Sequence, residues 1–591
     1  MKKLLLVMLS ISWLGLSAQT PTVAQPSSTG VSDAFRNYAK TNAAKLAKSL
    51  KAGVAGTQEV GIQEEDADVE VPNHFYIPRG GGESVNLTSK ASLAKAEALT
   101  LSVATAPSSM YTQTTNGTLP VTKVTDYVGL GNGFPGWTLQ NLLPPDTTMA
   151  VGNNQIVQWV NVRLTVLNKT TGSPLLPAPG YVTGSQIWSG LGSTSLCKNF
   201  NRGDPVLQYD RMAGRWLLSQ FAFNGTAATS SFAMCFAVSQ TSDATGSYNL
   251  YEYSNNPYLP DYPKLGVWTD AYYWTANDFD FRTNPNGAYA GTRDCALDRA
   301  AMLAGNPANM ICFAGLGATT GEYFASLPAD FEGSIAPPAG SAQYILNVDW
   351  FSKNNPPYFM ELRRFHPDFV NPLNSTLDDG FGGGPGSFVS MPFANNVIGA
   401  CGDGGGACVT QPGTTRRLDT LSMRPMYRLA YRNMGLNRES LVFTESVDPT
   451  GSAVAGIQLV EIRSPGANPP VVFNNVNLNP DATNRWMGAA ASDKVGNILL
   501  GYSASSGTVP PSIRIAGRQR NDIKSTLRGE IEVKTGAGNQ TSSAQRWGDY
   551  STMQIDPDDD CTFWYTQEYT NVSSSANWAT HIVGYKFNNC Q

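Results

Sequence analysis

The sequence lacks most of the residues and motifs on which common catalytic and metal sites are built. Only three histidines occur in 591 residues, His74, His366 and His581, and they are too widely spaced to suggest a zinc cluster. HExxH, GxSxG, the P-loop and GxGxxG followed by a helix are also absent. These absences argue against the enzyme classes that depend on those motifs. They leave His366 as the one candidate base for a serine hydrolase.

Charged residues and long apolar runs are scarce as well. Charged side chains make up 15% of the chain and the net charge is -5, which argues against nucleic acid as a partner. Beyond the N-terminus no apolar run approaches the roughly 18 residues of a transmembrane helix, so we expect no membrane span. By contrast, 57 glycines, 37 prolines and 10% aromatics are typical of turn-rich β structure.

The first residues have the pattern of a secretory signal peptide. Lys2 and Lys3 precede an apolar run from Leu4 to Leu16, which is too short to cross a membrane comfortably. Cleavage after Ala18 and cleavage after Ala24 both remain open. We therefore expect residues 1–24 to direct export and the mature protein to be secreted, either extracellular or periplasmic. We also expect it to be a monomer.

Eight cysteines fit export to an oxidising compartment, and none belongs to a CxxC pair. Eight cysteines allow 105 connectivities. Proximity in sequence favours four disulfides between neighbours: Cys197 with Cys235, Cys295 with Cys312, Cys401 with Cys408, and Cys561 with Cys590.

The chain after the signal divides into two regions. Residues 25–117 are rich in Ala, Ser, Thr and Lys, with an acidic connector, and indicate a propeptide-like or linker region rather than a packed domain. From residue 118 to residue 591, short apolar and aromatic runs alternate with Gly, Pro, Asn and Asp clusters in the manner of strands and turns.

The second region repeats one plan: a polar start, a short strand, an Asp/Gly/Asn turn and a more hydrophobic strand. Intervals between the anchors are 57 to 67 residues, apart from one of 158 that predicts a further unit near residue 340. The anchors are Asp146, Asp204, Asp261, Asp419, Trp486 and Asp549. The repeat predicts an all-β fold, a single β-propeller of about seven four-stranded blades.

The last unit shows how such a ring would close. "YSTMQID", "CTFWYTQEY" and "WATHIVGYKF" predict three strands, with Cys561 at the start of the second and Cys590 after the third. Antiparallel pairing brings these two ends together. The fourth strand is expected from residues near 105 to 120.

Several strings resemble the recurrent motifs of an uncharacterised family of large secreted bacterial β-propeller proteins. They are "RWGDYS", "DPDDDCTFWYTQEY", "RPMYRLAYRN" and "DATNRWMGAAASDKVGNILLGYS", and the resemblance runs from about residue 130 to the C-terminus. It implies a fold and export but no activity. More loosely, "DPDDDCTFW" resembles the Asp-box hairpin of sialidase-like propellers, where the box is a structural turn away from the active site.

Two sets of residues could form a site in the central funnel. If the acids begin the innermost strands, their side chains would converge at the mouth of the channel. They could then bind a cation such as calcium or act as acid and base on a glycosidic bond, or each could only cap a turn.

The arginines of the second set could bind anionic groups of a ligand, and a tyrosine beside them could abstract a proton in a uronate lyase reaction. Alternatively, this set only forms salt bridges between blades. The acids are Asp146, Asp204, Asp261, Asp419 and Asp549, and the second set comprises Arg202, Arg485, Arg546, Tyr427, Arg428, Tyr431 and Arg432.

A separate acidic turn is a weaker metal candidate. Asp556, Asp558 and Asp560 could bind calcium, but their spacing does not match an EF-hand loop, and a solvated turn is the favoured interpretation.

Two function classes follow. The favoured one is a secreted propeller that binds an extracellular polysaccharide or cell-surface partner through its funnel and loops. The alternative is a polysaccharide-active enzyme, glycoside hydrolase or uronate lyase, with its site in the same funnel. The lack of a catalytic motif favours binding, and abundant Trp and Tyr suit sugar stacking in both cases.

Overall fold

A computed structural model describes residues 20–38, 117–138, 143–318, 324–348, 358–383, 388–393, 398–399, 401, 406–422 and 424–591. The predicted signal sequence up to residue 19 and most of the predicted linker region, including His74, lie outside the described residues. Within them the structure is nearly all β. The few helical turns are η1 (Phe35–Asn37), α3 (Gly184–Ile187), α4 (Leu196–Asn199), α5 (Arg299–Ala304) and η5 (Pro372–Asn374).

The strands form antiparallel sheets of consecutive segments. The first holds β4 (Thr147–Val151), β5 (Gln155–Val160), β6 (Arg163–Asn168) and β7 (Val182–Thr183). The second holds β8 (Val206–Asp210), β9 (Arg215–Phe223), β10 (Phe232–Ser239) and β11 (Tyr248–Ser254). The third holds β12 (Tyr258–Val267), β13 (Ala271–Asp280), β14 (Ala288–Asp298) and β15 (Met310–Leu316).

The middle of the chain forms a larger sheet in which two such groups are joined. One group is β16 (Leu327–Glu332), β17 (Gln343–Val348) and β18 (Tyr358–His366), with β19 (Thr376–Asp378) and β20 (Val389–Phe393) both on β18. The other is β24 (Met426–Asn433), β25 (Glu439–Asp448), β26 (Gly456–Arg463) and β27 (Val471–Leu478), with β21 (Ile398–Gly399) on β25. A parallel pairing of β16 with β24 joins them. The unit expected near residue 340 is therefore present.

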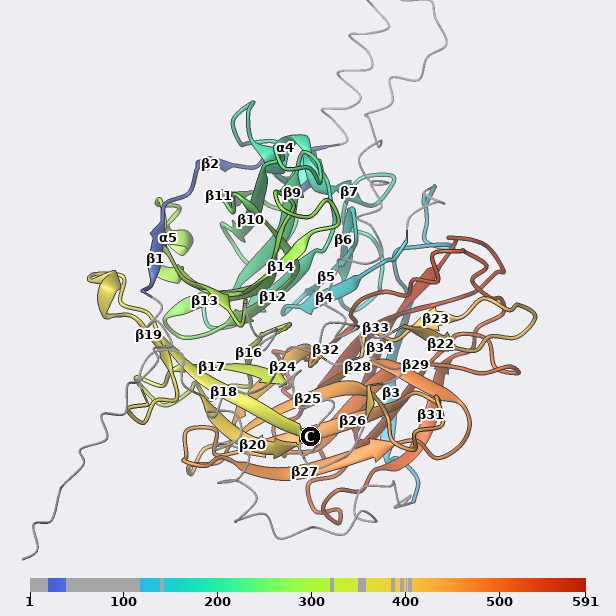
Figure 1. Cartoon of the computed structure of the whole chain (residues 1–591). Coiled ribbons are helices and arrows are strands. Elements are labelled where there is room, and N and C mark those ends of the chain that lie inside the picture. Colours follow the sequence, from blue (N-terminus) through green and yellow to red (C-terminus); the bar gives the residue numbers. More distant parts are fainter. Residues whose placement is uncertain are drawn as a thin grey trace, which may run out of the picture.

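Two further sheets complete the chain. One is β28 (Asn484–Ser492), β29 (Ile498–Ser505), β30 (Ser512–Arg518) and β31 (Arg528–Lys534). The last is β32 (Thr552–Ile555), β33 (Thr562–Tyr569), β34 (Ala579–Phe587) and β3 (Val121–Val128), while β22 (Ala407–Val409) and β23 (Leu418–Asp419) form a small ribbon. The first strands β4, β12, β16, β24, β28 and β32 lie toward the middle of the molecule, whereas later strands such as β7, β19, β27 and β31 lie farther out (Figure 1). This is the arrangement of a β-propeller.

Many strands in the sequence are apolar runs rather than alternating apolar and polar residues, because both faces of their sheets are buried. All eight residues of β10, FAMCFAVS, are buried, as are the eight of β33. An aspartate fixes the hairpin turns after β8 and β28, because Asp210 and Asp493 accept hydrogen bonds from backbone N–H groups two to four residues later. The Asp-box-like string "DPDDDCTFW" also forms such a turn, since Asp556 and Asp559 accept from backbone N–H groups two or three residues later.

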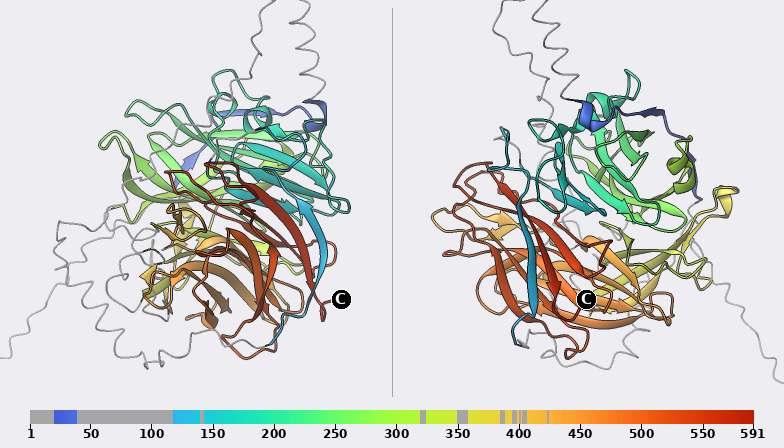
Figure 2. Two further views of the ribbon diagram at one scale, coloured as in Figure 1. Left: turned by 90° about the vertical axis from the view of Figure 1, so that its right-hand side faces the viewer. Right: turned by 180° about the vertical axis from the view of Figure 1, so that it is seen from behind.

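The prediction for the last unit is confirmed for its three strands, β32, β33 and β34, and is wrong by a few residues for the fourth. That strand is β3, which pairs antiparallel with β34 from Val121↔Phe587 to Val128↔His581. It therefore begins just beyond the range of 105 to 120. Figure 2 shows this early strand lying beside the last one.

Residues 20–38 cover the outer edges of two sheets. β1 (Thr22–Ala24) pairs with β15, and β2 (Ser28–Val31) pairs with β11; both lie along the outside of these sheets in Figure 1. Phe35 follows, fully buried and stacked on Tyr248 with ring centroids 4.8 Å apart. This segment removes two open strand edges, which are a liability for aggregation.

All four predicted disulfides are confirmed: Cys197–Cys235, Cys295–Cys312, Cys401–Cys408 and Cys561–Cys590. Cys295–Cys312 links the neighbouring strands β14 and β15, and Cys197–Cys235 links α4 to β10. A search of the described helices finds none with the length and apolar character needed to cross a membrane.

Phe35→Ala should test whether the N-terminal segment is part of the fold. Removing a fully buried aromatic ring should lower the stability by about 3–5 kcal/mol in chemical denaturation. The matched control is Arg36→Ala, because the Arg36–Asp243 ion pair is exposed and should contribute under about 1 kcal/mol. Equally small losses in both variants would show that the segment adds little stability.

Candidate functional site

The predicted acids lie where the polypeptide approaches the first strand of a sheet. Asp146 directly precedes β4, Asp204 lies two residues before β8, and Asp549 lies three before β32. Asp261 sits in β12 beside a bulge, and Asp419 ends β23. These five are called the strand-start acids below.

A left-handed residue recurs at these positions. Asp146 has φ 44°, Asp204 φ 47° and Tyr262 φ 56°. Aspartate tolerates this region better than most residues, because its short polar side chain can bond locally. The repeated aspartates thus have a conformational role in addition to any chemistry.

Hydrogen bonds and ion pairs link three of the strand-start acids, Asp146, Asp419 and Asp549. The backbone N–H of Asp549 donates to Asp146 Oδ1 at 2.8 Å, although the two are far apart in sequence. Arg546 forms ion pairs with Asp419, at 3.1 Å, and with Asp549. The N–H of Trp547 donates to Asp419 Oδ1 at 2.9 Å. One arginine therefore bridges the chain before β24 and the chain before β32.

Two cations that the sequence analysis missed complete this cluster. Lys264 Nζ is buried 3.2 Å from the ring centroid of Tyr262 and 4.3 Å from that of Tyr550. The guanidinium of Arg424 lies 5.0 Å from the Tyr262 ring. The signal for Lys264 was its place three residues after Asp261 in a strand that is otherwise apolar at its end.

Burial and mutual repulsion shift the protonation of this cluster. Burial, reinforced by Asp549 and Asp204, raises the pKa of Asp146 well above its usual value. Burial and Asp549 raise the pKa of Asp261 to about 7. Burial lowers the pKa of Lys264 to about 7, against the opposing effect of the nearby aspartates. The cluster can therefore exchange protons near neutral pH.

The Arg and Tyr set does not form an open anion site. Arg428 Nη2 contacts Asp330 at 2.5 Å and its Nη1 contacts Glu332 at 2.5 Å, which ties β24 to β16. Arg485 pairs with Glu530 at 2.7 Å and with Asp481.

The other members of the set are also engaged in structural contacts. Tyr427 is hydrogen-bonded to Gln208, Tyr431 to Glu439, and Arg432 to Asp560. The Nε of Arg202 donates to the carbonyl of Phe223 at 2.9 Å. Arg546 forms ion pairs with two strand-start acids, Asp419 and Asp549. Arg432 thus joins the sheet of β24 to the turn between β32 and β33, whereas Arg485 and Glu530 pair within one sheet.

The aspartates of the turn between β32 and β33 form ion pairs with lysine and arginine side chains. Lys169 Nζ lies 3.0 Å from Asp556 and 2.5 Å from Asp558. Arg432 contacts Asp560 at 3.0 Å. In the part of the chain that the structure describes, no group of three or more His, Cys, Asp or Glu side chains could hold a metal ion. The weak calcium assignment to Asp556, Asp558 and Asp560 therefore gains no support from this geometry.

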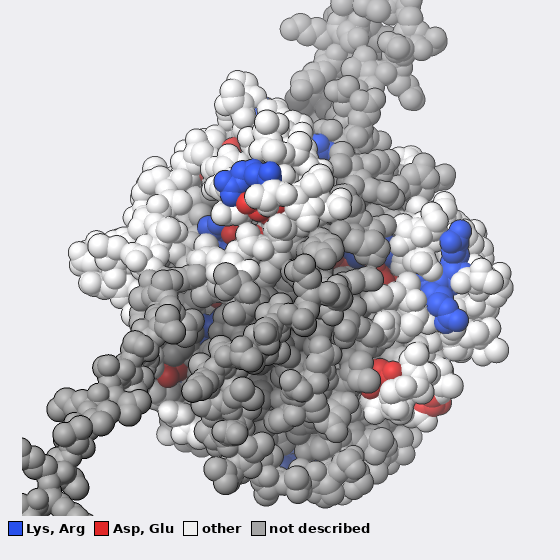
Figure 3. All heavy atoms as spheres, in the orientation of Figure 1, with Lys and Arg blue, Asp and Glu red and all other residues white. Residues whose placement is uncertain are grey.

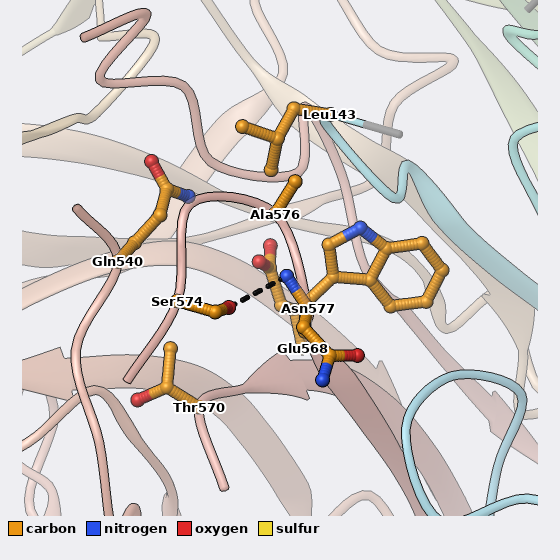
Figure 4. Close-up of a pocket in the computed structure, with 8 residues that line it drawn as sticks. Leu143, Gln540, Glu568, Thr570, Ser574, Ala576 and Asn577 are labelled. Atoms are coloured by element: carbon orange, nitrogen blue, oxygen red, sulfur yellow. Dashed lines mark hydrogen bonds between the residues drawn. The ribbon is translucent and has the colours of Figure 1, made fainter. Parts of the chain in front are cut away.

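A small pocket lies beside the strand-start acids. Its floor is formed by buried Gln540, Glu568, Thr570 and Trp578, and its rim by half-buried Leu143, Ser574, Ala576 and Asn577. Figure 4 shows the Glu568 carboxyl group among these side chains. The backbone N–H of Gly548 donates to Glu568 Oε2 at 2.9 Å, which links the pocket to the loop that carries Asp549.

Sequence reasoning missed this pocket. Glu568 belongs to the strand TFWYTQEY, in which all eight residues are buried. An acid within an otherwise buried strand was the available signal, but its partners come from three separate loops. Aromatic rings continue outward from the pocket, since Trp137 lies 5.4 Å from Trp578 and 5.8 Å from Tyr181 between ring centroids.

Charged side chains are scattered over the face seen in Figure 3. The coloured Lys and Arg side chains form small separate groups there, some of them next to acidic residues.

No protein-family model and no curated protein matches the sequence. Solved structures do match. A protein of unknown function from Dyadobacter fermentans DSM 18053 is 10% identical, with a TM-score of 0.33 over 79% of this chain and 100% of that one. An endo-arabinase from Bacteroides thetaiotaomicron VPI-5482 is 11% identical, with a TM-score of 0.25 over 55% and 95%.

A third match is a subtype N10 neuraminidase-like protein of A/little yellow-shouldered bat, 8% identical, with a TM-score of 0.30 over 67% of this chain and 98% of that one. At these identities and TM-scores the matches assign no function to this chain.

Asp261→Asn should change how stability depends on pH. The folded-state pKa of Asp261 is raised to about 7, so folding favours the protonated form and wild-type stability falls as the pH rises from 4 to 7. The amide cannot ionise. The variant should therefore gain stability relative to wild type over this range and keep a constant advantage above it, measured as denaturation midpoints.

Asp280→Asn is the matched control, on the next strand. Arg282 lowers the pKa of Asp280, so this carboxylate stabilises the fold once it is ionised. The variant should lose stability relative to wild type as the pH rises through 4, the opposite sign. Parallel pH profiles for wild type and Asp261→Asn would contradict a raised pKa at Asp261.

Proposed function

We propose that residues 118–591 form a single β-propeller of seven four-stranded blades that is exported and binds an extracellular glycan through the loops around the strand-start acids. The blade count is supported by the sheets. Dividing the joined sheet at the parallel β16–β24 pair gives seven groups among the described strands. Their first strands contact one another in order, and β32 also contacts β4.

Binding rather than catalysis is supported by one observation: the central charges neutralise one another. Arg546 is shared by Asp419 and Asp549, and Asp146 accepts from the backbone of Asp549. The two tyrosines considered for a lyase reaction, Tyr427 and Tyr431, are poorly placed to abstract a proton, because both are buried and hydrogen-bonded to neighbouring side chains. A scaffold that holds the ring together accounts for these contacts without a reaction.

A glycan is the partner class that the surroundings favour. Trp137 is half-buried and packs against Tyr181 and against Trp578, which lines the pocket beside the strand-start acids. One edge of this aromatic cluster is therefore open to solvent. Aromatic rings beside amide and hydroxyl groups suit sugars, whose faces are apolar and whose rims are polar.

A glycoside hydrolase at the same face is the second candidate. One observation favours it: the pKa of Asp261 is raised to about 7 and that of Asp419 to about 6, values suited to a general acid.

A panel of soluble polysaccharides should distinguish the two. We expect the purified protein to bind at least one polymer in affinity electrophoresis, with no reducing ends or unsaturated products released, in calcium and in chelator alike. Asp261→Asn should bind as well as wild type. Release of products that Asp261→Asn abolishes would instead establish the hydrolase, and no binding to any polymer would reject the glycan proposal.

A further inference from the structure

The floor of the pocket beside the strand-start acids holds two buried polar atoms without a partner. Glu568 has no exposed surface and Gln540 is 4% exposed. Among the residues that the structure describes, neither Glu568 Oε1 nor Gln540 Oε1 has a hydrogen-bond partner. Leaving such an atom unsatisfied costs free energy, so two of them at one pocket point to a group that bonds both.

Their neighbours show which atoms remain available. Glu568 Oε2 accepts from the N–H of Gly548 at 2.9 Å, and Gln540 Nε2 donates to the carbonyl of Arg546 at 2.6 Å. Both side chains are thus fixed at one end, with the other oxygen left over. Parallel bridging of Gln540 with Ser574 holds the two loops of the pocket together.

The size of the pocket limits what it can take. Its free space is about 10 Å³, close to the room that one water molecule needs, whereas pockets that enclose a whole ligand usually measure about 300–1,000 Å³. Half-buried Ser574, Ala576 and Asn577 form its rim. It therefore suits at most one hydroxyl-sized group of a larger ligand that lies across this face.

We propose that this pocket is a subsite for a single hydroxyl group of a neutral sugar, with Glu568 donating to the ligand oxygen and Gln540 Oε1 accepting its proton. The inference rests on the proposed glycan binding and deepens it. A hydroxyl group is both a donor and an acceptor, and so satisfies both orphaned atoms at once. Burial raises the pKa of Glu568 well above its usual value, which keeps the proton needed for donation.

The same surroundings disfavour an anionic ligand. A carboxylate or sulfate has no proton to give to Gln540 Oε1. It would also meet Asp419 and Asp549, which already act on Glu568 as neighbouring negative charges. Neutral polymers should therefore bind in preference to uronates and sulfated glycans.

Three variants test the subsite. Glu568→Leu removes both carboxyl oxygens and should weaken binding by at least about tenfold. Glu568→Gln keeps an acceptor for Gly548 and a donor for the ligand, and should stay within about threefold of wild type. Ala576→Trp covers the rim without altering the floor, and should weaken binding as Glu568→Leu does.

The probes are soluble glucan, galactan and arabinan as neutral polymers and polygalacturonate as an anionic one, with affinities from titration calorimetry and folding checked by thermal unfolding. If Glu568→Leu unfolds, Ala576→Trp and Glu568→Gln still carry the test. We expect wild type to bind a neutral polymer and the two disruptive variants to lose that affinity.

Each other outcome has a separate meaning. If wild type binds none of the polymers, the proposed function fails and the subsite with it. If wild type binds but Ala576→Trp and Glu568→Leu bind equally well, the subsite is wrong and glycan binding stands. Binding of polygalacturonate as tightly as a neutral polymer would overturn the ligand class.

Discussion

The charge balance where the first strands meet is the constraint on which the rest of the structure depends. Buried acids approach one another there from separate sheets, and burying like charges together is costly unless they are paired or protonated. Arg546 bridges Asp419 and Asp549, and Lys264 lies against Tyr262 and Tyr550 among the same acids. Each cation serves segments far apart in sequence, so the centre forms only when the sheets assemble around it.

The same local geometry repeated in several sheets produces this convergence. A left-handed residue turns the chain into the first strand at Asp146, Asp204 and Tyr262. Because the turn is repeated, the carboxyl groups are repeated, and the ring brings them to one place. Glu568 extends this region outward, since its carboxyl group accepts from the loop that carries Asp549. The pocket is thus built on the scaffold that holds the centre.

Much of the fold was predictable because its signals are local. Turn aspartates such as Asp210 and Asp493 bond to backbone a few residues away, and the four disulfides join cysteines that are neighbours in sequence. The strands β32, β33 and β34 follow from runs that need no distant partner to be recognised. The position of β3 was misjudged because a strand completing a sheet from the other end of the chain has a weak local pattern. The edge pairing of β1 was missed for the same reason.

The sequence by itself determined the all-β class, the repeat, the disulfide pairs and the acids that begin the strands, because periodicity and short-range bonding are written in neighbouring residues. The tertiary structure alone decided what those acids face, which arginines neutralise them, and that Gln540 and Glu568 share a pocket. Those outcomes depend on side chains hundreds of residues apart, or on different loops, whose distances are set by the packing of the sheets.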